Sequence, residues 1–104
     1  MDPKPIKMLK WAHKNGLLIV SRHTRIRLWE RCKIGHEVPT WIVAEQMIGG
    51  FPVGLWTGEA FNIRAMTWPI TFCCYARADG KIIVATALTV DQTRVNEQVF
   101  YGSR

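Results

Sequence analysis

Residues 70–90 read ITFCCYARADGKIIVATALTV, and this stretch decides the fold. Two runs rich in aromatic and β-branched residues flank Asp79-Gly80, a dipeptide that is typical of tight hairpin turns. The pattern predicts two antiparallel strands, over residues 70–77 and 81–90. Both faces of the second strand are largely apolar, so we expect this strand to lie in the middle of the sheet.

The segments before this hairpin predict two further strands and, upstream of them, helices. Aromatic and β-branched residues recur over 53–56 and 60–68, which predicts strands there. After the brief apolar run 17–20, Ser21 is a suitable helix cap and Gly35 a suitable stop. The sequence therefore predicts an α+β fold in which N-terminal helices pack on a four-stranded, mainly antiparallel sheet. The predicted helices span residues 5–14, 22–33 and 39–48.

The size and composition of the chain fit one globular domain. A chain of 104 residues is too short for two cores, and 48% apolar with 21% charged residues is ordinary for a folded protein. We expect one domain over 1–104, with an N-terminal extension over 1–16 and a polar C-terminal tail over 92–104. No apolar run is long enough to span a membrane, and residues 1–20 do not resemble a signal peptide. Because three cysteines also argue against a disulfide framework, we expect a cytoplasmic protein with no membrane partner.

The positive charge is concentrated in the first third of the chain. The whole sequence has 14 Lys and Arg against 8 Asp and Glu, a net charge of +6. Residues 1–33 hold nine of those cations and only two carboxylates, so this segment carries +7 and the rest is close to neutral. Such asymmetry indicates a polyanionic partner, most simply nucleic acid. A solvated basic surface and an acidic protein partner remain alternatives.

Residues 21–31, SRHTRIRLWER, contain the groups best suited to chemistry. On a helix, His23, Arg27 and Arg31 recur every four residues and form one ridge. Guanidinium groups bind phosphate oxygens through paired hydrogen bonds, and a histidine beside them can transfer protons near neutral pH. The alternative is an exposed arginine-rich helix without a site. Ile26 and Trp29 lie opposite this ridge, so we expect them in the core.

Other basic residues of this segment are candidates for contacts to nucleic acid, namely Arg22, Arg25 and Lys33. Arg25 falls in the apolar sector of the predicted helix, where it must extend to solvent, pair with a carboxylate or reach a ligand. In the third predicted helix, the apolar positions fit one stripe that faces the core. These positions are Val38, Trp41, Ile42 and Ile48.

The motif around His23 resembles a family. His23-Thr24-x-x-Arg27-Leu28, followed by Glu30-Arg31 and Ile34, resembles the HA-x-x-R-M-x-x-R-x-I stretch of small bacterial and phage domains. Those domains are similar to the fold group of barnase, EndoU, colicin-type tRNases and RelE-type toxins. In them a last strand carries a Thr-Val pair, where this chain has Thr89-Val90. The resemblance covers residues 17–91 and implies an α+β fold and RNA cleavage without a metal or a cofactor.

Cleavage of this kind transfers the phosphate to the 2′-hydroxyl, and it needs a base, an acid and positive charge at the phosphate. His23 and Glu30 suit the proton transfers, whereas Arg27 and Arg31 suit the charge. Thr89 is a candidate donor of a hydrogen bond to phosphate, with an ordinary strand threonine as the alternative. The expected catalytic set is therefore His23, Arg27, Arg31 and Thr89.

The expected partner is RNA, with tRNA as one candidate, together with a cognate antitoxin or immunity protein if the chain is a toxin. The alternative function is a non-catalytic phage or plasmid inhibitor that binds a host defence or nucleic-acid-processing complex. Trp56 and Trp68 are expected to pack in the core, and the alternative is that they are exposed for stacking on bases or for protein binding. His13, His36 and Cys32 lack the spacing of a zinc site, so we expect no metal.

Overall fold

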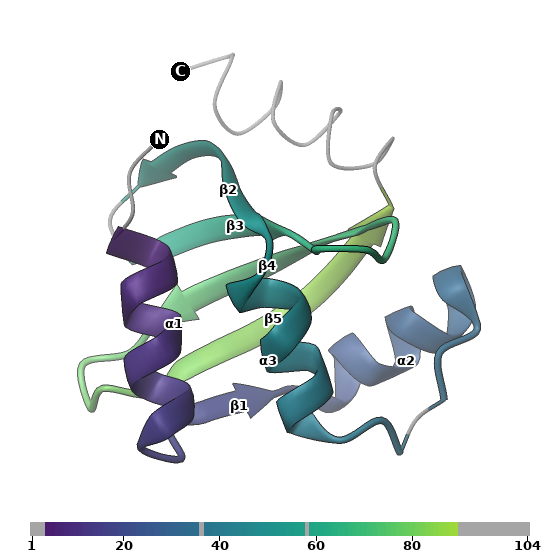
Figure 1. The fold of residues 1–104 in the computed structure, drawn as a ribbon, viewed down its shortest axis with the longest axis horizontal. Helices are drawn as coiled ribbons and strands as arrows, with labels where there is room; N and C mark the ends of the chain where they lie inside the picture. The colour runs from purple at the N-terminus through teal and green to yellow at the C-terminus, as the bar shows by residue number, and fades with distance from the viewer. Residues whose placement is uncertain (1–3, 36, 58, 90–104) are drawn as a thin grey trace.

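The computed structural model describes residues 4–35, 37–57 and 59–89, and it confirms the α+β class. In this part of the chain, α1, β1, α2 and α3 come first and four consecutive strands follow, and the five strands form one sheet in the order β1-β5-β4-β3-β2 (Figure 1). The predicted tail over 92–104 lies outside the described residues. The elements are α1 (Lys4–Lys14), β1 (Leu18–Val20), α2 (Arg22–Cys32), α3 (Thr40–Ile48), β2 (Phe51–Thr57), β3 (Ala60–Arg64), β4 (Ile70–Ala76) and β5 (Ile82–Thr89).

The sheet has five strands and is mixed, which corrects the predicted four-stranded sheet. The additional strand is β1, which pairs in parallel with β5 through Leu18 and Ile82, whereas all other neighbours are antiparallel. A strand of three residues is too short to show the alternation by which strands are recognised in a sequence. The prediction that β5 is internal is confirmed, because β1 and β4 flank it.

The β4–β5 hairpin turns at the predicted dipeptide. Arg77 N donates to Lys81 O at 2.8 Å, and the Asp79 carboxylate accepts from Lys81 N at 3.1 Å. Gly80 has a φ of +88°, in the left-handed region that favours glycine. The Asp79-Gly80 pair therefore provides both the hydrogen-bond acceptor and the backbone freedom that this turn needs.

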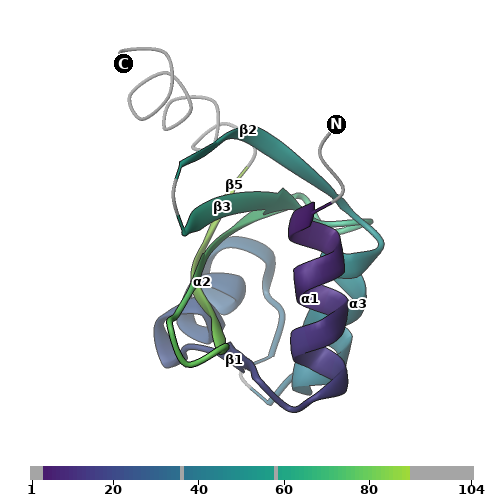
Figure 2. The same cartoon turned by 90° about the vertical axis from the view of Figure 1, so that its left-hand side faces the viewer.

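Two of the helices cover one face of the sheet. Figure 2 shows α1 and α3 together on one side of the strands, with α2 beside the β1–β5 edge. Leu9 and Ala12 of α1 are fully buried, so the segment expected as an N-terminal extension contributes to the core. From the sheet, side chains of β3, β4 and β5 complete this core. They are Phe61, Ile63, Ile70, Phe72, Cys74, Val84 and Ala87.

The stripe by which α3 packs differs from the prediction. Val43, Ala44 and Met47 are fully buried, whereas Trp41 is 53% exposed. Because α3 is apolar around most of its circumference, periodicity alone does not define its inner face. Gln46 then fixes the β3–β4 connection to α3, since its side chain bonds Thr67 and accepts from the backbone N–H of Trp68 at 3.1 Å.

A candidate nucleic-acid interface on α2

Helix α2 closes the edge of β5 that β1 leaves open. β1 ends at Val20, and the next backbone N–H, that of Ser21, still donates to Val84 O at 3.1 Å. Beyond that point the strand pairing with β4 shifts by one residue, leaving Ala85 as the extra residue of a bulge. The carbonyl groups of this edge need hydrogen-bond donors, and α2 supplies them.

Three side chains of the α2 segment donate to these carbonyls. Thr24 Oγ1 donates to Val84 O at 2.7 Å, and Ser21 Oγ lies 3.1 Å from Ala85 O. Near the other end of the helix, the Arg31 guanidinium donates to Ala87 O. The helix is therefore held along the strand edge by polar contacts at both ends.

The ends of α2 are only partly as predicted. Ser21 is the N-cap, as expected, and accepts from Thr24 N at 3.1 Å. At the C-terminal end, the left-handed residue is Lys33, with a φ of 57°, and not Gly35. This left-handed residue ends the helix two residues before the glycine, and the Ile34 N–H beyond it donates back to Leu28 O at 3.3 Å.

The face that α2 buries is not the predicted one. Thr24 and Leu28 are fully buried, whereas Ile26 is 39% exposed and Trp29 is 45% exposed. The expectation that Trp29 lies in the core is therefore wrong. The physical reason is that this helix packs on a strand edge, where hydroxyl and guanidinium donors are needed more than apolar side chains.

This orientation places a continuous row of side chains on the outside of α2. Arg22, Ile26, Trp29 and Lys33 follow one another at helical spacing, and all four are exposed. We call these four residues the outer stripe. Lys33 Nζ lies 5.5 Å from the centroid of the Trp29 ring, so the stripe combines an aromatic surface with positive charge.

The predicted ridge is divided between two environments. His23 is exposed, and Arg27 Nε lies 3.4 Å from His23 Nε2, at the long end of hydrogen-bond distance. Arg27 also forms an ion pair with Glu30, at 2.7 Å between Nη1 and Oε1. Arg31 is half-buried and bonds Ala87 O. The structure brings His23, Arg27 and Glu30 together on the surface and places Arg31 against the sheet.

Thr89 lies at the end of β5 that is farther from His23. It pairs with Ile70, four residues beyond Ala85, where the start of α2 is attached. At about 3.3 Å per strand residue, this offset is about 13 Å. Arg31 contacts the strand between these two points. The four residues of the expected catalytic set are thus spread along the α2–β5 contact rather than gathered at one point.

Two further groups lie on the inner side of α2. Burial raises the pKa of Cys73 to about 11, and the nearby Arg31 guanidinium lowers it in part. Arg25 Nη2 donates to Thr40 Oγ1 at 3.1 Å, and its Nη1 donates to Val38 O. Arg25 therefore connects α2 to the start of α3, and it is half-buried in this position.

The remaining tryptophans differ from one another. Trp68 packs against the core, with its ring centroid 6.3 Å from that of Phe72. The side chain of Trp56 lies outside the described residues, as does His36. The exposure of Trp29 was not predicted from the sequence, although Ser21, Thr24 and Leu28 fall on one side of the helix. Two hydroxyls in line with a leucine were the signal that this side faces a strand edge.

No family model, curated protein or solved structure matches this chain. Within residues 4–35, 37–57 and 59–89, no three His, Cys, Asp or Glu side chains are grouped so that they could hold a metal ion. In the same part of the chain, no helix has the length and apolar character needed to cross a membrane.

Proposed function

We propose that the protein binds single-stranded RNA through the outer stripe of α2. The observation that carries this proposal is the exposed Trp29 ring with Lys33 beside it, in one row with Arg22. Rings that stack on unpaired bases and cations that bind phosphates are the two components of single-strand binding surfaces. A tryptophan that is half exposed also leaves apolar surface that a stacked base would cover.

The distribution of charge supports the same surface. Residues 1–33 carry nine cations against two carboxylates, and both α1 and α2 lie within this segment. Arg22 and Lys33 are eleven residues apart, which corresponds to about 16 Å along the helix. The outer stripe is therefore long enough to contact more than one phosphate of an extended strand, with Trp29 between the contacts.

Fluorescence anisotropy with a labelled single-stranded RNA of mixed sequence tests this proposal. Trp29→Ala should weaken binding about tenfold, the scale expected for losing one base–aromatic stack. Trp41→Ala is the matched control, because Trp41 is exposed to a similar extent on α3, and it should leave the affinity unchanged. Equal losses in the two variants, or no binding by the parent chain, would contradict the proposal.

A pair of double variants tests the charge contribution. Removing Arg22 and Lys33 should flatten the dependence of affinity on salt concentration by about 0.7 per lost phosphate contact. Removing Lys10 and Lys14 of α1 changes the net charge by the same amount away from the outer stripe. If both pairs alter the salt dependence equally, binding is unspecific attraction to a basic protein.

RNA cleavage is a second candidate, and the arrangement of His23, Arg27 and Glu30 favours it. Arg27 lies between the imidazole and the carboxylate, at 3.4 Å and 2.7 Å. A neutral imidazole at His23 can accept the proton of a 2′-hydroxyl while Arg27 binds the phosphate. This function accords with the resemblance to toxin-type ribonucleases. Arg31 would have to leave Ala87 O to reach the same phosphate, and Thr89 lies farther along the strand.

His23→Gln separates cleavage from binding. Glutamine retains hydrogen bonding but transfers no proton, so cleavage of tRNA should fall about a hundredfold while anisotropy is unchanged. Asn15→Gln, an exposed change outside α2, is the control. Cleavage at the parent rate by His23→Gln would refute the catalytic role, and absence of any cleavage by the parent would leave a binding protein. In that case no antitoxin or immunity protein is expected.

A further inference from the structure

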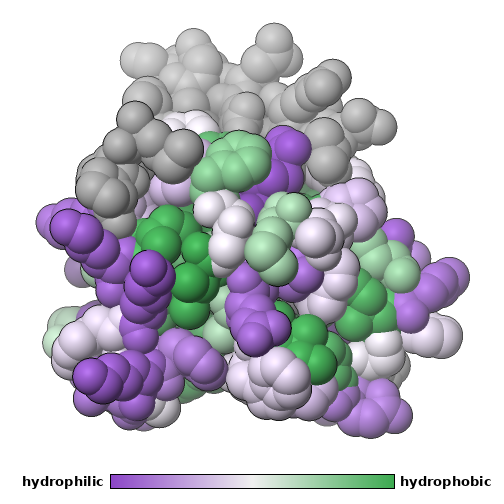
Figure 3. Space-filling model, viewed as in Figure 1, coloured by the Kyte–Doolittle hydropathy of each residue, from purple (hydrophilic) through white to green (hydrophobic). Residues whose placement is uncertain are grey.

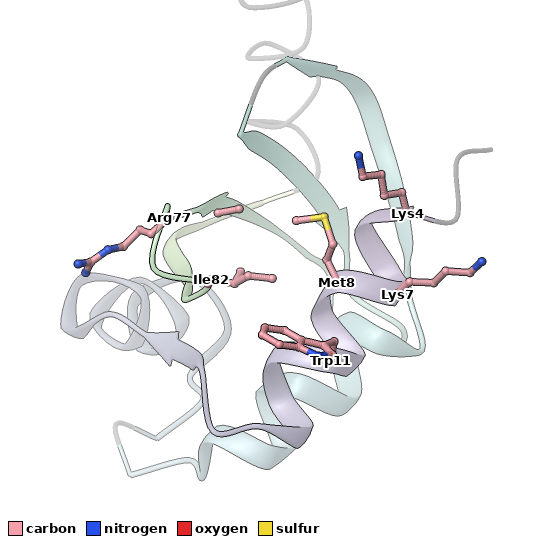
Figure 4. A pocket seen from close by; sticks show the side chains of 8 residues that line it. Lys4, Lys7, Met8, Trp11, Arg77 and Ile82 are labelled. Atoms are coloured by element: carbon pink, nitrogen blue, oxygen red, sulfur yellow. The ribbon is translucent and has the colours of Figure 1, made fainter.

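A separate hollow of about 360 Å³ lies between α1 and the end of the sheet where β4 turns into β5 (Figure 4). Met8 and Trp11 of α1 form one wall, and Ile82 of β5 faces them across the opening. Ala76 and Gly80 complete the apolar lining. A hollow of this size falls in the range of sites that hold small molecules.

The wall exists because α1 has two neighbouring apolar stripes. Leu9 and Ala12 belong to the inner stripe and are fully buried in the core. Met8 and Trp11 lie on the adjacent stripe, and Trp11 remains 55% exposed. A Cβ at Gly80 would lie 3.7 Å from two atoms of the Trp11 ring, so the indole lies beside the hairpin turn. The exposed part of the indole is apolar surface that the core does not use.

Cationic side chains surround this apolar opening. Lys4, Lys7 and Arg77 line the hollow with their stems, and Figure 4 shows Lys7 and Arg77 pointing outward from it. Arg77 is partly neutralised, because its Nη2 lies 3.0 Å from Asp79 Oδ2. Figure 3 shows hydrophilic side chains gathered over α1. The opening thus offers apolar contact inside and positive charge at its rim.

We propose that this hollow binds a free small molecule with an aromatic body and an anionic head. The body would lie between Trp11, Met8 and Ile82, where it covers the exposed indole. The head would stay at the rim near Lys7, because a charge placed deeper would lose its hydration without a partner. This site is independent of the RNA proposal, since its walls come from α1 and the β4–β5 hairpin, not from the outer stripe of α2.

Two fluorescent dyes of the same shape test the site on the full chain. The probe is 1-anilinonaphthalene-8-sulfonate, and its uncharged counterpart is N-phenyl-1-naphthylamine. Trp11→Ala should weaken both dyes about tenfold, because it removes the apolar wall. Lys7→Glu should weaken binding of the sulfonate about fivefold and leave binding of the uncharged dye unchanged. Lys10→Glu, the same charge change on α1 away from the hollow, should have little effect on either dye.

One further variant should strengthen binding. Asp79→Asn retains a side-chain oxygen for the turn but removes the carboxylate that neutralises Arg77, so the sulfonate should bind about threefold more tightly. Three results would overturn the proposal. They are dye binding that survives Trp11→Ala, equal effects of Lys7→Glu on both dyes, and equal effects of Lys7→Glu and Lys10→Glu. The lysine pair keeps the test decisive if Trp11→Ala does not fold, because both lysines are exposed.

Discussion

Helices α1 and α2 are both eleven residues long and both rich in cations, yet they meet the sheet in different ways. α1 lies over a sheet face and buries Leu9 and Ala12. α2 lies along a strand edge, where Thr24 and Arg31 donate to backbone carbonyls. A sheet face needs apolar side chains and a strand edge needs donors. The edge position therefore leaves Ile26 and Trp29 of α2 on the outside.

The largest loss of stability is expected when the apolar contacts that attach α1 to the sheet are removed. Leu9→Ala removes a fully buried side chain and should lower the free energy of unfolding by about 3 kcal/mol. Trp11→Ala removes a larger but half-exposed side chain of the same helix and should cost less. Urea denaturation of both variants gives the comparison, and a greater loss for Trp11→Ala would show that α1 packs through its other stripe.

The Cys73 thiol on the inner side of α2 should make the stability of the protein depend on pH. Burial raises the pKa of Cys73 from 9.0 to about 11, so the unfolded chain loses this proton first as the pH rises. The free energy of unfolding should therefore fall between pH 9 and 11, by up to about 1.4 kcal/mol per pH unit from this group. The free energy of unfolding of Cys73→Ala should fall less steeply with pH than that of the parent. Identical slopes of the two pH profiles would contradict the burial of this thiol beside Arg31.

Removing a hydrogen bond that attaches α2 to the strand edge should cause an intermediate loss of stability. Thr24→Val keeps the volume of a fully buried side chain but loses the hydrogen bond to Val84 O. We expect a loss of about 1.5 kcal/mol in the free energy of unfolding. Ile26→Val, a change of similar size on the exposed side, should cost less than about 0.5 kcal/mol. If the order is reversed, apolar packing and not hydrogen bonding attaches α2.

The sequence predicted features that depend on local chemistry. Asp79-Gly80 forms the hairpin turn, and Ser21 caps α2, because each of these residues acts on its own neighbourhood. Strand β1 was missed because three residues carry too little pattern. The inner face of α2 was misassigned because the sequence does not reveal that Val84 and Ala85 offer free carbonyls to this helix. Helical spacing assigns Ile26 and Trp29 to the core, and in the folded chain both side chains face outward.

The candidate site was predicted only in part, because residue spacing along the helix is visible in the sequence and contacts with the strand edge are not. His23 and Arg27 lie together on the exposed surface, as expected from their spacing of four residues. Arg31 shares that spacing, but its long side chain reaches back to Ala87 O on the strand edge. Trp29 was expected in the core and is instead the center of the outer stripe. The residues best placed to bind a ligand therefore include one that the sequence pattern assigned to packing.

A small effect on stability is also expected at Trp29 itself. Because its ring is half exposed, Trp29→Ala should change the free energy of unfolding by less than about 1 kcal/mol. The same variant should lose most of its affinity for RNA. Thermal denaturation checks the first statement, and a large drop in stability would show that the ring is needed for the fold.

NMR titration of the indole N–H signals tests most directly whether the outer stripe of α2 contacts single-stranded RNA. The chain has five tryptophans, so each gives its own reporter in one spectrum. On addition of a short oligouridine, the Trp29 signal should shift in proportion to RNA bound, while the exposed Trp11 and Trp41 serve as internal references and stay in place. A stationary Trp29 signal with RNA bound, or equal shifts of all three, would contradict the account.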